Sequence, residues 1–164
     1  MPAQSIDPWG DNLIEDYAAI ARHFGLEKFD AKLFPEPNML MRRGLVFAGR
    51  DLKRVSDSIK QKKPYYVLTG VVPSAEKIHL GTKSVIENVK YFQEHGAETY
   101  VLVADLEAAA ARGVSVQEAQ ERAREFYIPA YLALGLDIKK TKFYYQSENR
   151  TVTKLAFEAA QKIT

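Results

Sequence analysis

The sequence contains no cysteine among its 164 residues, which excludes disulfide bonds and thiolate metal sites. It also lacks any apolar run close to the roughly 20 residues that a membrane-spanning helix needs. The first segment, MPAQSIDPWG, has neither the basic nor the apolar region of a signal peptide. We therefore expect a cytoplasmic protein with no membrane segment, and the length suits a single domain.

Neither sign of charge dominates. The chain has 23 basic and 21 acidic side chains, for a net charge of +2. This balance does not favour binding to nucleic acid through the overall field of the protein. Any contact with RNA would be local, or would lie on parts of a protein outside this sequence.

Short apolar runs alternate with helical patterns through most of the chain. The strand-like runs are 65–70, 99–105 and 142–147, and helical spacing covers 79–96, 115–135 and 149–164. This alternation predicts an α/β fold with a parallel sheet and helices on both faces. Tyr65, Tyr66 and Val67 are expected in the sheet core. Ligands of such folds bind at the carboxyl ends of the strands.

Local signals mark the ends of the helices. Gly96 is expected to close the helix that starts near residue 79. Ser115 and Glu118 offer a capping box for the next long helix, and Pro129 is expected to kink that helix. Towards the N-terminus, residues 11–24 have helical spacing, with Asp11 as the expected N-cap.

The chain divides by composition near Pro64. We predict a mostly helical N-terminal extension over residues 1–63, which packs on the α/β part formed by residues 64–164. The last helical pattern reaches Thr164 without a terminating glycine or proline. This predicts that the sequence is a fragment of a longer catalytic region.

The loop after the first apolar strand has the residues that a phosphate site needs. They are Thr69, Gly70, Pro73, Ser74, His79, Gly81 and Thr82. The start of a helix presents unpaired amides that attract phosphate, and a glycine there lets a nucleotide approach the backbone. Taken alone, His-Leu-Gly more often marks a tight turn with an exposed histidine.

The motif is not alone. Pro73-Ser74 followed by Ile78-His79-Leu80-Gly81 resembles the His-Ile-Gly-His signature of class I aminoacyl-tRNA synthetases, in the form of the tyrosine and tryptophan enzymes. Other segments resemble the tryptophanyl-tRNA synthetases of archaea and eukaryotes: Asp7-Pro8-Trp9, Arg42-Arg43-Gly44, Arg50-Asp51-Leu52, Ala104-Asp105-Leu106-Glu107-Ala108 and Phe143-Tyr144-Tyr145-Gln146-Ser147. The resemblance covers nearly the whole chain.

The resemblance implies a Rossmann-like catalytic domain that activates tryptophan with ATP and transfers it to tRNA. It implies catalytic roles for His79 and Thr82 and an amino-acid pocket that includes Leu68 and Glu107. It implies ATP binding by Thr69, Gly70, Pro73, Ser74, His79 and Gly81. Mg²⁺ would accompany ATP without a dedicated protein site, and a homodimer would form through helices near residues 80–135. The alternative for Glu107 is a solvated acid at a strand end or helix start.

Two residues and two missing segments depart from this pattern. Thr82 replaces the second histidine of the signature, and Ala75 replaces a glycine that often follows Pro-Ser. The Lys-Met-Ser-Lys-Ser loop of these enzymes and their anticodon-binding domain have no counterpart here. Residues 54–58 mimic that loop, but they precede His79 in a helical pattern, and we interpret the match as coincidence.

Three other functions stay open at this point. The first is a tyrosyl-tRNA synthetase, which shares the fold and the signature. The second is an inactive synthetase-like binding module, favoured by Thr82 and the missing loop. The third is another nucleotidyl transferase of the same α/β type, although the N-terminal extension argues against it.

Overall fold

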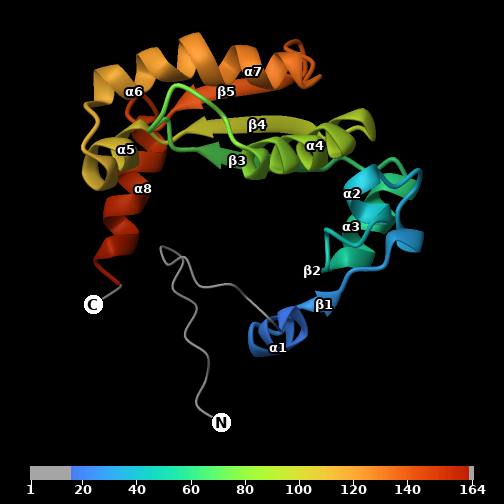
Figure 1. Cartoon of the computed structure of the whole chain (residues 1–164). Coiled ribbons are helices and arrows are strands. Elements are labelled where there is room, and N and C mark those ends of the chain that lie inside the picture. Colours follow the sequence, from blue (N-terminus) through green and yellow to red (C-terminus); the bar gives the residue numbers. More distant parts are fainter. Residues whose placement is uncertain (1–15, 163–164) are drawn as a thin grey trace.

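The structure is a computed structural model that describes residues 16–162. Its centre is a three-stranded parallel sheet, with β3 (Tyr66–Val71), β4 (Glu98–Val103) and β5 (Thr141–Tyr145) in the order β3-β4-β5 (Figure 1). Tyr66 pairs with Glu98 at one end of the sheet, and Val71 pairs with Val103 at the other. The predicted α/β class and parallel sheet are confirmed.

One face of the sheet is covered by α4 (Leu80–Glu94) and by the helical stretch from α6 (Val116–Arg122) to α7 (Ile128–Ala133) (Figure 1). Side chains alternate between the two faces along each strand. Those that point towards the helices form the main core with them: Val71, Ile86, Val89, Val101, Val103, Ala123, Tyr127, Tyr131 and Leu136. Burial of these apolar side chains is the main force that holds the helices to the sheet.

The opposite face of the sheet is open among the described residues. Tyr66 and Leu68 are 71% and 54% exposed there, and Tyr144 lies in the same hollow. The expectation that Tyr66 lies in the core is therefore wrong, because Tyr66 shares its side of β3 with Leu68 and not with Val67. α8 (Arg150–Ala160) begins beside this face and runs away from the sheet (Figure 1).

The long helix, in which a kink was predicted at Pro129, contains a π turn, η2 (Ala123–Tyr127), directly before α7. Pro129 has no N–H to donate to the carbonyl four residues earlier. The amide of Ile128 donates to Ala123 O, one residue further back than in an α-helix. At the start of α6, the Ser115 hydroxyl accepts from Glu118 N at 3.1 Å, which confirms one half of the predicted capping box.

Helix α5 (Asp105–Arg112) was not predicted, and it begins at the last residue of the strand that the apolar pattern predicts over 99–105. The strand predicted over 99–105 ends at Val103, because Ala104 leaves the extended conformation (φ −84°, ψ 64°). Asp105 and Glu107 stand in the first turn of α5, where acidic side chains favour a helix. These local signals outweigh the short apolar run.

The N-terminal extension contains short elements. They are α1 (Tyr17–His23), β1 (Glu27–Lys28), the 3-10 turn η1 (Ala31–Leu33), α2 (Met39–Arg42), β2 (Ala48–Gly49) and α3 (Leu52–Lys60). Asp16 caps α1, since its carboxylate accepts from Ala19 N at 2.8 Å. The predicted N-cap Asp11 and the segment 7–9 lie outside the described residues.

The extension packs on α4 through a second apolar cluster, in which Phe34, Met41, Leu52 and Ile59 surround Tyr91 of α4. The Tyr91 hydroxyl donates to Pro35 O at 2.6 Å. Burial raises the pKa of Tyr91 to about 12, so this hydroxyl stays protonated and donates across the neutral range. Within residues 16–162, no helix combines the length and apolar character needed to cross a membrane.

Candidate functional site

The carboxyl ends of the three strands meet at one edge of the sheet. Beyond the strands, Ala104 N donates to Val71 O at 2.8 Å and Gln146 N donates to Val103 O at 2.9 Å. The residues that follow β4 and β5 are therefore bonded to the last residues of the neighbouring strands β3 and β4. This is the edge at which parallel α/β sheets bind ligands.

The β3–α4 loop, defined as residues 72–79, leads from this edge to the first turn of α4. His79 is the N-cap residue of α4, and its Nδ1 accepts from Thr82 N at 3.4 Å. The Thr82 hydroxyl lies 3.4 Å from His79 Nε2. Histidine is not among the residues that cap helices well, so its presence here gains little for helix stability. Its ring stands beside a helix start whose amides are suited to an anion.

Gly81 leaves room for the imidazole ring of His79. A Cβ atom at residue 81 would lie 3.1 Å from both Cε1 and Nδ1 of that ring. This distance is tighter than ordinary van der Waals contact, so a side chain at residue 81 would displace the ring. The glycine and the histidine of the signature are thus linked by direct contact.

Gly81→Ala is a test of this contact. Alanine within a helix is favoured over glycine by about 1 kcal/mol, so we expect the melting temperature to stay level or rise. The His79 ring must shift by some tenths of an ångström, and we expect ATP to bind about fivefold more weakly. Thermal unfolding and calorimetric titration with ATP measure the two effects. Unchanged ATP affinity would show that the position of the ring is unimportant.

The other predicted residues near the loop lie in different environments. Pro73 is fully buried, whereas Ser74 is exposed and its amide donates to Val72 O at 2.8 Å. Thr69 lies on the helix-covered side of β3 with Val67 and Val71, while Gly70 lies on the open side with Leu68. The structure therefore groups Gly70 with Leu68 and separates both from the side chain of Thr69.

A buried carboxylate joins the loops after β4 and β5. Asp105 is 0% exposed, and its oxygens accept from Ser147 N at 3.0 Å, Ser147 Oγ at 2.5 Å and Gln120 Nε2 at 2.8 Å. Leu106 N donates to it at 3.0 Å. Burial alone would raise the pKa of Asp105, but the bonds from Ser147 and Gln120 outweigh burial, so the pKa is below its usual value.

Glu107 lies in the first turn of α5, two residues after this buried aspartate, and its side chain is exposed. The predicted amino-acid-binding pair thus lies on different elements, with Glu107 at the strand ends and Leu68 on the open face. Leu68 lines an open hollow of about 540 Å³ together with Tyr66, Tyr100, Lys142, Tyr144 and Asn149.

Sequence reasoning missed the aromatic side chains of this hollow. Tyr66, Leu68 and Gly70 recur at every second position of β3, and Tyr100 with Leu102 does the same in β4. Such alternation indicates two faces of a strand, and it was available in the sequence. Tyr100 is held by Glu98, whose Oε2 accepts from its hydroxyl at 2.8 Å, and by Lys142 Nζ, which donates to that hydroxyl at 3.1 Å.

No group of three or more His, Asp or Glu side chains is arranged to hold a metal ion in the part of the chain that the structure describes. The segment 54–58, which mimics the second synthetase signature, lies inside α3. There the Ser56 hydroxyl donates to Leu33 O at 2.5 Å and is buried. Its role is thus to fasten α3 to the η1 turn within the extension.

Comparison with known proteins decides the family. Residues 60–159 match the family described as tRNA synthetases class I (W and Y). The chain belongs to this family. Its class I synthetase fold is also seen in the crystal structure of tryptophanyl-tRNA synthetase from Aeropyrum pernix K1, with a TM-score of 0.81 and 36% identity, over 97% of this chain and 45% of that one.

The curated relatives of this synthetase chain include two archaeal proteins. Tryptophan--tRNA ligase 1 of Halobacterium salinarum is 40% identical over 94% of this chain and 30% of its own length. Tryptophan--tRNA ligase of Aeropyrum pernix is 39% identical over 92% of this chain and 42% of its own length. The chain therefore spans less than half the length of either relative. A tryptophan-bound synthetase from Encephalitozoon cuniculi matches with a TM-score of 0.72 and 29% identity, over 82% of this chain and 42% of that one.

Proposed function

We propose that this synthetase chain takes part in the ATP-dependent activation of tryptophan, the first step of a tryptophan–tRNA ligase reaction. The observation that carries the proposal is His79 at the start of α4, directly after the loop that leaves the carboxyl edge of the sheet. Relatives named as tryptophan–tRNA ligases support tryptophan over tyrosine.

In the proposed reaction, a carboxylate oxygen of tryptophan attacks the α-phosphorus of ATP. The bond between the α-phosphorus and the bridging oxygen breaks, and pyrophosphate leaves with that oxygen. Catalysis of such a step depends on positioning the reactants and on stabilising phosphate charge. His79 and Thr82 would donate hydrogen bonds to phosphate oxygens, together with the first-turn amides of α4.

The remaining predicted residues would shape the binding site. Gly70, Pro73, Ser74 and the backbone of Thr69 would border ATP, with Gly81 leaving space for the His79 ring. Leu68 and the open-face hollow would receive the indole ring of tryptophan, and Glu107 would bind its ammonium group or its indole N–H. Mg²⁺ bound to the phosphates would neutralise charge that develops on pyrophosphate.

The partners and setting of the enzyme belong to the same proposal. More than half the length of the two archaeal relatives lies outside the matched region, and we expect most tRNA contacts there. We also propose a homodimer that forms through helices of residues 80–135, and a cytoplasmic location.

The test is tryptophan-dependent exchange of pyrophosphate into ATP, with tyrosine as the control amino acid. We expect exchange with tryptophan only, and about a tenfold loss in His79→Ala, since a hydrogen bond to a charged group contributes about 1.5–3 kcal/mol. Exchange with tyrosine only would instead assign the tyrosine enzyme.

A chain that binds neither substrate would contradict the proposal and favour an inactive binding module. If exchange is absent but ATP still binds, adding the remaining part of the Aeropyrum pernix enzyme would separate an incomplete active site from an inactive one. Exchange restored by that addition, and lost again in His79→Ala, would support the proposal.

A further inference from the structure

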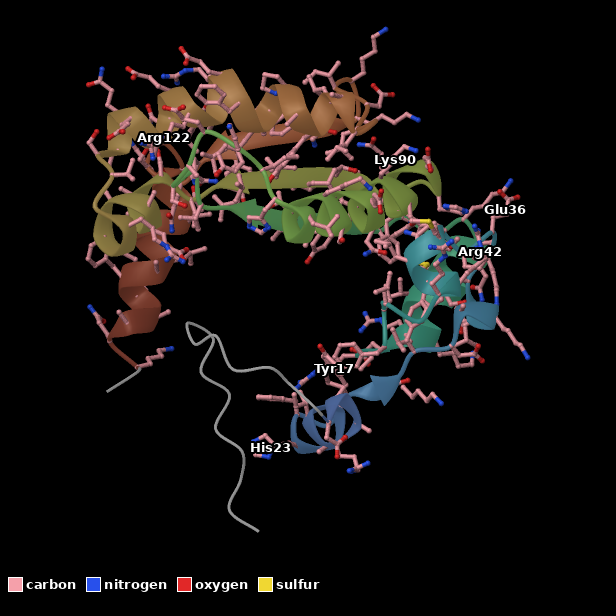
Figure 2. The ribbon with its side chains drawn as sticks, viewed as in Figure 1. Tyr17, His23, Glu36, Arg42, Lys90 and Arg122 are labelled. Atoms are coloured by element: carbon pink, nitrogen blue, oxygen red, sulfur yellow. The ribbon has the colours of Figure 1, made fainter. Side chains whose placement is uncertain are left out.

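Two side chains of a helix that follows much later in the sequence hold the β3–α4 loop in place. Arg122 Nη1 donates to Ser74 O at 2.6 Å, and Ala75 N donates to the Tyr127 hydroxyl in a long bond of 3.4 Å. Ser74 O and Ala75 N belong to the same peptide unit in the middle of the loop, so the two contacts fix that unit from both its carbonyl and its amide side. Figure 2 labels Arg122 where α6 meets this loop.

The π turn explains how both residues reach the same loop. In an α-helix, residues five apart point about 140° away from each other. Between Arg122 and Tyr127 the helix contains η2, where Ile128 N bonds to Ala123 O. The wider π turn reduces the angle between the two side chains and turns both towards the loop. π turns inside α-helices occur often at functional sites.

Each of the two side chains is itself held in place. The second terminal nitrogen of Arg122, Nη2, contacts Glu118 Oε1 at 2.6 Å, and the arginine side chain is only 21% exposed. The ring of Tyr127 is 5% exposed in the main core, edge-on to Tyr131 with 6.4 Å between the ring centroids. Arg122 therefore acts as a fork between a carboxylate and a carbonyl, a geometry that lysine does not reproduce.

We infer that Arg122 and Tyr127 are positioning residues for the nucleotide: they set the β3–α4 loop and, through it, the place of His79. This inference rests on the proposed function. Neither residue needs to touch a substrate, because a carbonyl held at Ser74 fixes the path of the chain towards the start of α4. A loop without these contacts would bind ATP only after it is ordered, which lowers the apparent affinity.

The experiment compares ATP and tryptophan binding by calorimetry in the full chain and its variants. Arg122→Gln removes the charged donor, Arg122→Lys keeps one, and Tyr127→Phe removes only the hydroxyl. Glu118→Gln keeps the Ser74 contact without the ion pair, and Tyr131→Phe removes the hydroxyl of the neighbouring core tyrosine. Hydrogen exchange of the amides of residues 74–79 reports directly on the loop.

We expect Arg122→Gln to weaken ATP binding about tenfold and Arg122→Lys about threefold. Tryptophan binding should stay within about twofold, and Tyr131→Phe should resemble the unchanged chain. Glu118→Gln should weaken ATP binding less than Arg122→Gln, because the contact of Arg122 with Ser74 O remains. Exchange at 74–79 should be faster in Arg122→Gln without a change in β4. Equal loss of ATP and tryptophan binding with a lower melting temperature would show a merely structural role and overturn the inference.

The two proposals fail in different ways. If His79→Ala weakens ATP binding and Arg122→Gln does not, the positioning role is wrong and the proposed function stands. If the unchanged chain binds no ATP, both are wrong.

Discussion

Replacing Asp105 with alanine is expected to lower the free energy of unfolding by about 3 kcal/mol or more. The carboxylate is fully buried and accepts from Ser147 and Gln120. Removing it leaves the amide and hydroxyl of Ser147 without this acceptor, while Gln120 Nε2 keeps only its bond to Ser147 Oγ at 3.0 Å. Each unsatisfied buried polar group costs about 1–3 kcal/mol. For a chain of this length the melting temperature should fall by about 6–12 °C, measured by thermal unfolding and urea titration.

Asp105→Asn is the matched variant, because it keeps the shape and loses the charge. The lowered pKa of Asp105, against an ordinary value of 3.8, means that its ionised form stabilises the fold. This contribution is fully present above pH 3.8 and is lost as the pH falls through the lower pKa of the folded state. The stability difference between the unchanged chain and Asp105→Asn should therefore shrink at acid pH. A difference that does not change between pH 6 and the acid limit would contradict this account.

Gly70→Val is expected to weaken substrate binding by about 100-fold, equivalent to about 2.7 kcal/mol, without harm to the fold. The nearest atom to a Cβ at residue 70 is Leu102 O at 3.9 Å, so an added Cβ is in ordinary contact with the described structure. β-Branched residues suit strands. The added methyl groups would project from the open face, next to Leu68, into space that we assign to the substrates.

The control for Gly70→Val is Leu68→Ala, which enlarges the same face instead of filling it. Binding of ATP and tryptophan by calorimetry, with thermal unfolding of each variant, separates affinity from stability. A Gly70→Val chain that binds both substrates normally would place them elsewhere. A chain that loses stability as well would mean that glycine serves the strand itself.

The sequence was sufficient for the sheet, the β3–α4 loop and the synthetase family. Apolar runs and the His79-Leu80-Gly81 helix start are local patterns. The three strands and the start of α4 lie within about two residues of their predicted positions. Helix α5 was missed because the apolar run at 99–105 was assigned to a strand up to Asp105, although Asp105 belongs to the acidic first turn of the helix. Tyr66 was misplaced because a run of apolar residues does not say which face a side chain takes.

The contacts of Arg122 and Tyr127 with the β3–α4 loop could not be predicted from the sequence. Arg122 and Ser74 are 48 positions apart, and their contact depends on how α6 and η2 lie over the sheet. Pro129 gave a signal for a broken helix, but the form of the break, a π turn, depends on packing against the core. Arg42, which belongs to the Arg42-Arg43-Gly44 segment of the family resemblance, lies in the extension (Figure 2) and donates to Pro37 O at 2.5 Å.

Strand β3 is an edge strand of the sheet: among residues 16–162 it pairs only with β4. The same strand contains Gly70 and leads into the β3–α4 loop. The edge of β3 that does not face β4 and the candidate site therefore belong to one continuous segment of backbone. A chain segment that paired with this edge of β3 would make the strand more rigid and favour the ordered conformation of the loop. By thermodynamic linkage, a nucleotide that orders the loop would then strengthen that pairing by the same factor. Substrate binding and the pairing of a chain segment with β3 would thus both depend on the same equilibrium, the ordering of the β3–α4 loop.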